Sequence, residues 1–197
     1  MMLDRNDTKL AGFVFKGQIA TSAVQALTGR SKRSVEASFE EIATKVSLSV
    51  LDEDAVEAAR KMAAVYIAIA SFENMMRDLV ASRLLETKGA NWWDQAAISN
   101  DVKKRAETRM EQEKQIRWHQ ARGLSQIYFT ELGDLPSIIH GNWPDFEVLL
   151  RDIEWVRHIV RTIERSRNVI MHSGQLSMDD VERVGVSIRD WLRQVGG

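Results

Sequence analysis

The 197-residue chain is long enough to bury a real hydrophobic core, since 44% of its residues are hydrophobic. Its formal charge of −1 gives no general attraction to nucleic acid or anionic lipid, so any such affinity must come from local clusters of basic residues. The lack of cysteine excludes disulfides, thiolate nucleophiles, zinc fingers and iron–sulfur ligation. No Walker-type loop and no G-x-G-x-x-G sequence occurs, so nucleotide hydrolysis and dinucleotide redox chemistry lack a site.

The composition predicts an all-α fold, because prolines and strand-like alternation are scarce while Ala, Leu, Glu, Arg and Met are abundant. The longest apolar run, residues 62–72, is shorter than the roughly 18 residues of a membrane span. We therefore expect a buried helix there and no membrane association. The N-terminus lacks signal-peptide organisation, so the expected location is cytoplasmic.

The pattern of the first half of the chain predicts a helical extension that precedes the main domain. Short helices over Lys16–Leu27 and 34–46 would form an N-terminal helical extension, residues 1–50, ahead of a helical domain over 51–197. Asp52 is expected to cap a first long helix that reaches about Thr87 and ends at Gly89.

Residues 97–122 carry many charges and few apolar anchors, which predicts a solvated or projecting helix. Between Asp101 and Arg122 there are seven basic and four acidic residues, with Trp118 and His119 among them. This segment could bind RNA by charge and stacking, or it could be a solvated helix face. Trp92 is expected to be a core anchor, as is Trp93.

Turn signals over residues 123–144 predict one or two short helical turns, and Phe146 then begins a predicted second long helix. Apolar residues recur in that helix at steps of three and four up to residue 163. Gly174 is expected to end it. Ser177 and Asp180 resemble a capping box for a last helix to about Val195.

The apolar residues that recur along the second long helix form a stripe on one of its faces, and Arg167 occupies the next position of that stripe after residue 163. A guanidinium keeps its charge, so a core-facing arginine is costly unless a carboxylate or a phosphate meets it. Glu164, one turn back, and Glu73, at an equally unusual phase of the first long helix, are the candidate partners. Both a buried structural ion pair and a functional site fit this pattern.

His172 lies about 140° around the helical wheel from Arg167, so the two do not share a face. It aligns instead with a polar stripe of basic character that could hold phosphates, formed by Asn168, Arg165, Arg161 and His158. The helix dipole in the last turn favours a cation, which would suit His172 to exchange protons. Alternatively, His172 is a capping residue and the stripe is a solvated face.

The sequence "RNVIMH", an arginine and a polar residue followed by a histidine after four intervening positions, resembles the signature of the HEPN superfamily of helical domains. The stretches "SFENMMRDLV", "KGANWWDQ", "ELGDLPSIIHGNWPDF" and "RNVIMHSGQLS" resemble the branch shared by bacterial defence-type proteins and a eukaryotic messenger-RNA surveillance endonuclease. The resemblance covers about residues 60–195. It implies a bundle with two long antiparallel helices and shorter C-terminal helices.

The resemblance also implies a metal-independent endoribonuclease that needs no cofactor and acts as a homodimer, with two arginines and two histidines lining one cleft. Arg167 would bind the scissile phosphate, His172 would handle the proton of the 2′-hydroxyl or of the leaving oxygen, and Asn168 would orient the phosphate or the histidine. Glu73 and Glu164 would hold Arg167. Attack by the 2′-hydroxyl would leave a 2′,3′-cyclic phosphate, and DNA should resist.

Other functions stay open on the sequence. A HEPN-like module could bind nucleic acid without cutting it, and a helical interaction protein would need neither Arg167 nor His172. A carboxylate-bridged metal site is disfavoured because Glu154 and His158 are four positions apart, not three. The habits of the family suggest a toxin or antiphage effector, with an antitoxin or defence-system protein as partner.

Overall fold

The computed structural model describes residues 39–116, 122–123 and 125–196, and these form helices and turns with no strand among them. The elements in chain order are η1 (Leu48–Val50), α3 (Glu53–Lys88), α4 (Trp92–Gln95), α5 (Asn100–Gln115), η2 (Gln126–Phe129), η3 (Leu132–Asp134), α6 (Leu135–Gly141), α7 (Trp143–Phe146), α8 (Ile153–Met171) and α9 (Met178–Val195). The predicted all-α class is confirmed.

The chain divides into two compact units, and the unit Met62–Gln194 contains every predicted site residue. In the other unit, residues 39–45 are helical, as predicted for that part of 34–46, and η1 follows. The predicted helix Lys16–Leu27 lies outside the described residues, as do Trp118 and His119. The predicted domain boundary at residue 50 stays a prediction.

The ends of α3 follow from local chemistry, and both match the prediction. A carboxylate oxygen of Asp52 accepts a hydrogen bond from the N–H of Ala55 at 2.9 Å, which satisfies a free donor of the first turn. Gly89 follows the last turn with φ of 78°, a conformation that costs glycine little. The buried face of α3 contains two charged residues, Glu73 and Arg77, among six apolar ones.

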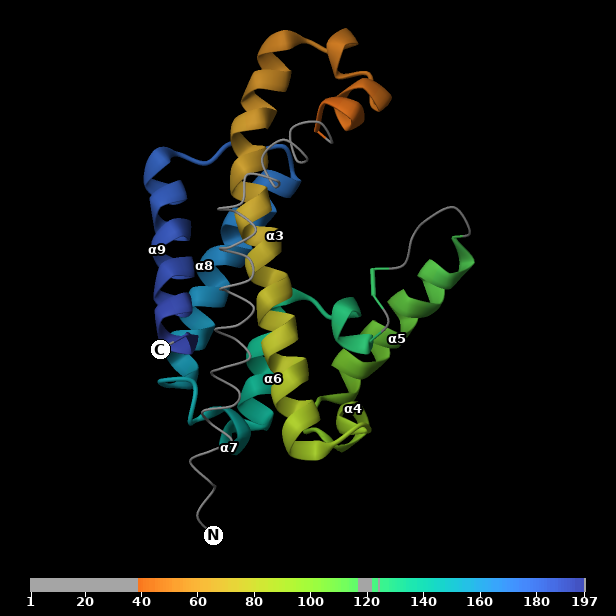
Figure 1. Ribbon diagram of the computed structural model, residues 1–197, viewed down its shortest axis with the longest axis vertical. Helices are drawn as coiled ribbons and strands as arrows, with labels where there is room; N and C mark the ends of the chain where they lie inside the picture. Colours follow the sequence, from red (N-terminus) through yellow and green to blue (C-terminus); the bar gives the residue numbers. More distant parts are fainter. Residues whose placement is uncertain (1–38, 117–121, 124, 197) are drawn as a thin grey trace, which may run out of the picture. The chain divides into compact units, whose positions relative to one another are not determined.

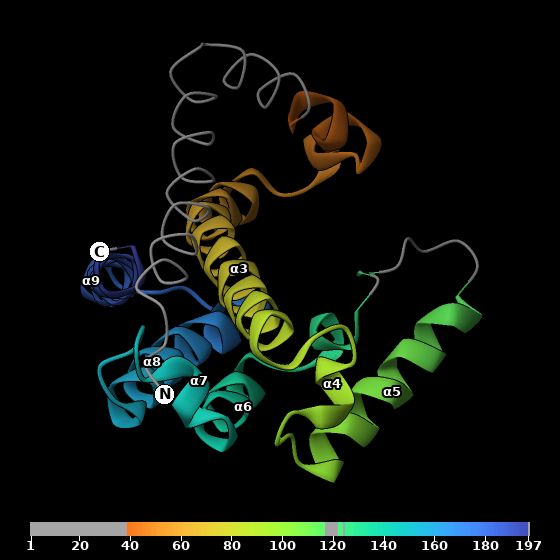
Figure 2. The ribbon, with the colours of Figure 1, turned by 60° about the horizontal axis from the view of Figure 1, so that its bottom comes forward.

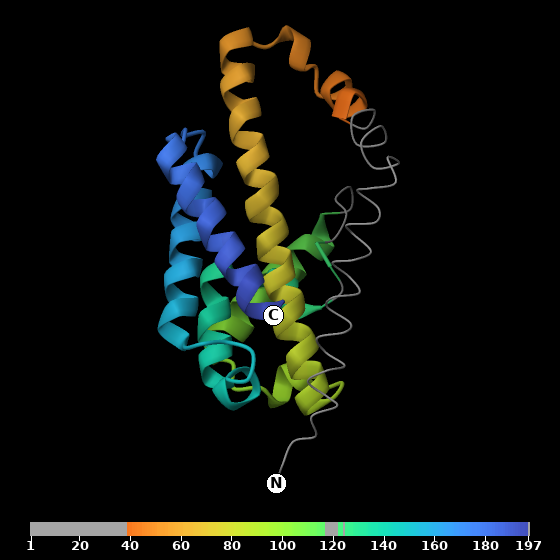
Figure 3. The same cartoon turned by 60° about the vertical axis from the view of Figure 1, so that its left-hand side comes forward.

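Helices α3, α8 and α9 lie side by side (Figure 1), and aromatic rings pack between them. Trp191 of α9 meets the ring of Phe72 edge-on at 5.7 Å between centroids and stacks on Trp155 of α8 at 5.6 Å. Figure 3 shows α8 running antiparallel to α3 and α9 returning beside it. The predicted cap of α9 is present, since the hydroxyl of Ser177 accepts a hydrogen bond from the N–H of Asp180 at 3.2 Å.

The predicted start of the second long helix was wrong. The helical turn α7 ends at Phe146, and α8 begins only at Ile153. Asp152 has extended backbone and accepts a hydrogen bond from the N–H of Trp155 at 2.7 Å, so a new helix starts there. Phe146 is buried and Leu149, the next position of the predicted apolar stripe, is partly buried in spite of the break, so the apolar spacing continues across it.

The charged helix α5 was predicted to be solvated or projecting, but one of its faces packs against the rest of the protein, which corrects that prediction in part. Val102 and Ala106 are buried, and α5 packs against η2. In Figure 2, α4 and α5 lie on the other side of α3 from α9. Trp92 and Trp93 are buried and meet edge-on at 5.5 Å, so their prediction as core anchors is confirmed.

Candidate active site

A polar pocket of about 340 Å³ brings together α3, α5, α8 and the segment that contains η2 and η3. Its lining residues are Glu73, Arg77, Arg109, Arg122, Thr130, Glu131, Leu132, Glu164, Arg167 and Asn168. Four of the predicted site residues are among them: Glu73, Glu164, Arg167 and Asn168. The lining holds four arginines and three glutamates, and Arg122 also pairs with Glu113. The charges nearly balance, but the four guanidiniums together offer many N–H donors to an anionic ligand.

Glu73 lies between two guanidinium groups. One carboxylate oxygen is 2.7 Å from Nη2 of Arg77, and the other is 3.6 Å from Nε of Arg167. The side chains of Glu73 and Arg77 are only 12% and 10% exposed, whereas that of Arg167 is 38% exposed. Arg77 also donates to the carbonyl of Thr130 at 3.1 Å. Arg77 is therefore fixed inside the protein, while Arg167 faces the pocket with donors to spare.

The stripe position predicted for Arg167 needs a correction. Ser166 is the buried residue at this level of α8, and Arg167 lies at the edge of the buried face. A long arginine side chain at such an edge can extend toward solvent and toward a carboxylate, so it avoids the desolvation that a core position would impose. A carboxylate was expected beside Arg167, and Glu73 supplies it.

Glu164 lines the same pocket but lies beyond ion-pair distance of Arg167, unlike Glu73. Its carboxylate instead lies over Gly133, where an added Cβ would come within 2.8 Å of Oε1. The small residue in η3 therefore leaves room for the Glu164 carboxylate at the pocket wall.

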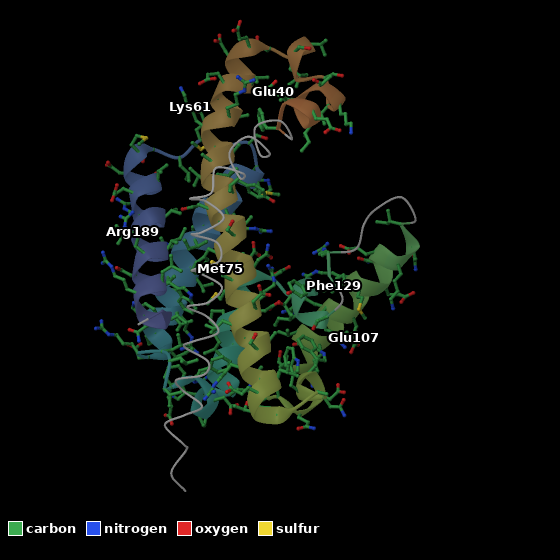
Figure 4. The ribbon with its side chains drawn as sticks, viewed as in Figure 1. Glu40, Lys61, Met75, Glu107, Phe129 and Arg189 are labelled. Atoms are coloured by element: carbon green, nitrogen blue, oxygen red, sulfur yellow. The ribbon has the colours of Figure 1, made fainter. Side chains whose placement is uncertain are left out.

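Arg109 and Arg122 also line the pocket; they lie in the charged segment that was predicted either to bind RNA or to be a solvated face, but neither residue was singled out. Arg109 of α5 donates to the carbonyl of Phe129 at 2.9 Å and pairs with Glu131, and Arg122 lies over the Phe129 ring at 5.8 Å. Figure 4 shows Phe129 beside α5. Arg77 could have been found, because it follows Glu73 by four residues on the same buried face. Glu131 begins one of the stretches that carry the family resemblance, but nothing in the sequence gave it or Thr130 a role. Both reach the pocket only through the tertiary fold.

His172 does not line the pocket. It directly follows α8 as the C-terminal capping position, where its backbone N–H donates to the carbonyl of Asn168 at 3.2 Å, and its side chain is exposed. The residues of α8 that were predicted to bind RNA are also exposed and outside the pocket lining; they are His158, Arg161 and Arg165. One copy of the chain thus holds Arg167 and Asn168 in the pocket but leaves His172 on the surface.

Among the described residues, no cluster of three or more histidine and acidic side chains is arranged to hold a metal ion. In the same part of the chain, each helix is too short or too polar to cross a membrane.

Comparison with known proteins agrees with this architecture. A family model described as Swt1-like HEPN matches residues 68–196, which cover the pocket residues as well as Arg167 and His172. No curated protein and no solved structure matches the chain. Because the family model spans more than half of the sequence, the chain belongs to the Swt1-like HEPN family.

Proposed function

We propose that the protein is an endoribonuclease that cleaves RNA without a metal ion, with the Arg167 pocket as its phosphate-binding site. The observation that carries this proposal is the half-exposed Arg167 guanidinium in a pocket lined by three further arginines. A phosphodiester is the anion that RNA would present to such a pocket, and a planar guanidinium can contact two of its oxygens at once. Membership of a HEPN family supports RNase-type chemistry.

The reaction would be an in-line attack of a 2′-hydroxyl oxygen on the adjacent phosphorus. The bond from phosphorus to the 5′-oxygen breaks, leaving a 2′,3′-cyclic phosphate and a free 5′-hydroxyl. Arg167 would stabilise the negative charge that builds up on the phosphate oxygens, and Asn168 would orient that phosphate. His172 would take the proton from the attacking hydroxyl or give one to the leaving oxygen.

His172 reaches this chemistry in our proposal from a second copy of the chain. The two residues are about 140° apart around α8, and His172 is exposed at the end of the helix. A homodimer in which the ends of two α8 helices meet would place the His172 of one copy near the Arg167 pocket of the other. Arg161, Arg165 and His158 would then flank the bound RNA.

A second candidate is a HEPN-like module that binds RNA without cutting it. The position of His172 outside the pocket favours this candidate, because the arginines alone can hold a phosphate but cannot move a proton. A role as a toxin or antiphage effector, with an antitoxin or defence-system partner, is compatible with either candidate.

The test is incubation of the purified chain with single-stranded RNA in the presence of a chelator. Wild type should cut the RNA and leave 2′,3′-cyclic phosphate ends, and Arg167→Ala should lower cutting by at least about a hundredfold. Arg157→Ala is the matched control, since Arg157 lies on α8, pairs with Glu154 and is outside the pocket. Cutting that persists in Arg167→Ala would refute this site. Binding without cutting in wild type would favour the second candidate.

A further inference from the structure

A second, shallow and open hollow lies along one face of α5 and shares Arg109 with the candidate active site; it is called the α5 groove below. The groove has a volume of about 370 Å³ and is lined by Asp101, Lys104, Arg105, Thr108, Arg109 and Gln112. All six residues belong to α5, and their spacing of three and four places them on one face of that helix. Arg109 lines both the groove and the Arg167 pocket, so the two hollows lie next to each other.

The groove is basic, although the whole chain has a formal charge of −1. Its lining contains three cations, Lys104, Arg105 and Arg109, and one carboxylate, that of Asp101. Arg105 and Arg109 are also paired with carboxylates outside the lining, those of Asp134 and Glu131. Lys104 is exposed and has no ion pair within the described part of the chain. A stretch of positive charge next to a phosphate pocket is what a polyanionic strand would follow.

The arginines of the groove are held in place yet keep free donors. Nη2 of Arg105 is 2.7 Å from the buried carboxylate of Asp134, which also accepts a hydrogen bond from the N–H of Glu131 at 3.0 Å. The side chain of Arg105 is nevertheless 47% exposed. A guanidinium has five N–H donors, so one contact with Asp134 leaves others available for a phosphate. Holding the arginine in advance reduces the entropy lost on binding.

We propose that the α5 groove is a binding track for single-stranded RNA, along which Arg109, Arg105 and Lys104 hold the phosphates that neighbour the one bound at Arg167. One helical turn, about 6 Å along the axis, separates Arg105 from Arg109, so the two cations can contact successive parts of one strand. This inference rests on the proposed ribonuclease function for its choice of RNA as the ligand. The track binds the backbone and so discriminates little between base sequences.

The test compares two lysines of α5 in the full chain. Lys104→Gln removes a charge from the groove, while Lys114→Gln removes the same charge from a position outside both hollows. The probe is a fluorescent RNA of about 12 nucleotides with methylated 2′-hydroxyls, which the proposed chemistry cannot cut, and binding is followed by anisotropy at several salt concentrations.

Lys104→Gln should bind this probe several-fold more weakly than wild type, with a salt dependence (log K against log salt) that is shallower by about 0.7. Lys114→Gln should match wild type. The loss caused by Lys104→Gln should shrink with a dinucleotide probe, whose single phosphodiester can occupy the Arg167 pocket but cannot also reach along the groove. Arg105→Gln should behave like Lys104→Gln, after its folding has been checked by thermal unfolding.

The results separate this inference from the proposed function. If Arg167→Ala abolishes cutting while Lys104→Gln and Lys114→Gln bind RNA equally well, the track is overturned and the ribonuclease stands. If wild type never cuts RNA but Lys104→Gln weakens binding as expected, the track stands and the proposed function fails.

Discussion

At the scale of single residues, Glu73 is the carboxylate on which the candidate site depends, because one negative charge serves two guanidiniums. The pair of Glu73 and Arg77 is buried, and removing one partner of a buried pair leaves the other charge without compensation. We expect Glu73→Gln to lower the free energy of unfolding by about 3 kcal/mol, measured by urea denaturation. The double variant Glu73→Gln with Arg77→Met should recover part of that loss. A change below about 1 kcal/mol in Glu73→Gln would show that solvent screens the pair.

Tyr128 offers a test of the geometry beside the pocket. Its hydroxyl donates a hydrogen bond to a carboxylate oxygen of Asp78 at 2.6 Å. This bond, together with burial and the negative charge of Asp78, raises the pKa of Tyr128 above 10.0, and the positive charge of Arg77 opposes the shift only weakly. The contact therefore stabilises the fold below the ordinary tyrosine pKa and is lost as pH rises through the raised value. Because the chain has two tyrosines, Tyr66→Phe leaves Tyr128 alone for an absorbance titration. Asp78→Asn in that background should lower the pKa of Tyr128, and an unchanged titration would contradict the contact.

At the scale of elements, the cap of α8 fixes where the helix that carries Arg167 begins. Asp152 supplies that cap, so Asp152→Ala should lower the free energy of unfolding by about 1 kcal/mol. Asp152→Asn should keep most of the stability, since an asparagine oxygen can accept the same hydrogen bond from Trp155. Chemical denaturation of the three proteins checks this. Equal losses in both variants would mean that the charge of Asp152, and not its hydrogen bond, is what matters.

Local signals predicted those elements whose ends are set by local chemistry. The cap at Asp52, the glycine at 89 and the cap at Ser177 fixed the limits of α3 and α9 to within a residue or two. The start of α8 was missed because the apolar positions 146, 149 and 153 keep the spacing of a helix while the backbone turns between Phe146 and Ile153. Apolar spacing cannot distinguish that arrangement from a continuous helix.

In the candidate site, too, residues marked by a local sequence pattern could be predicted, whereas residues brought in by tertiary packing could not. Glu73 could be predicted because a charge at a buried phase of a helix needs a partner. Its closest partner is Arg77, and Arg167, at the edge of the buried face of α8, is its second. Arg109 and Arg122 could not be assigned, because they reach the pocket only when α5 folds back against η2. A pocket assembled from segments far apart in sequence leaves no periodic trace in any one of them.

At the scale of the whole molecule, one copy of the chain carries an incomplete version of the proposed site. Its pocket contains Arg167, while His172 lies on the surface next to two exposed apolar side chains of α8, Val169 and Met171. Exposed apolar residues beside functional ones are typical of surfaces that associate. In a two-fold dimer, the same patch of each copy contacts the other, so each His172 can approach the partner's pocket.

This arrangement predicts that two inactive variants restore activity when they are combined. Arg167→Ala and His172→Ala should each fail to cut RNA as homodimers. After the two are mixed, unfolded and refolded together, about half of the dimers contain one copy of each and hold one intact pair of Arg167 and His172 across the interface, giving about a quarter of the wild-type rate. The rate is measured with a fluorogenic RNA, and the mixed dimers are confirmed by two affinity tags. If Arg167 and His172 acted within the same copy, no mixed dimer would hold an intact pair, and the mixture would stay as inactive as its components.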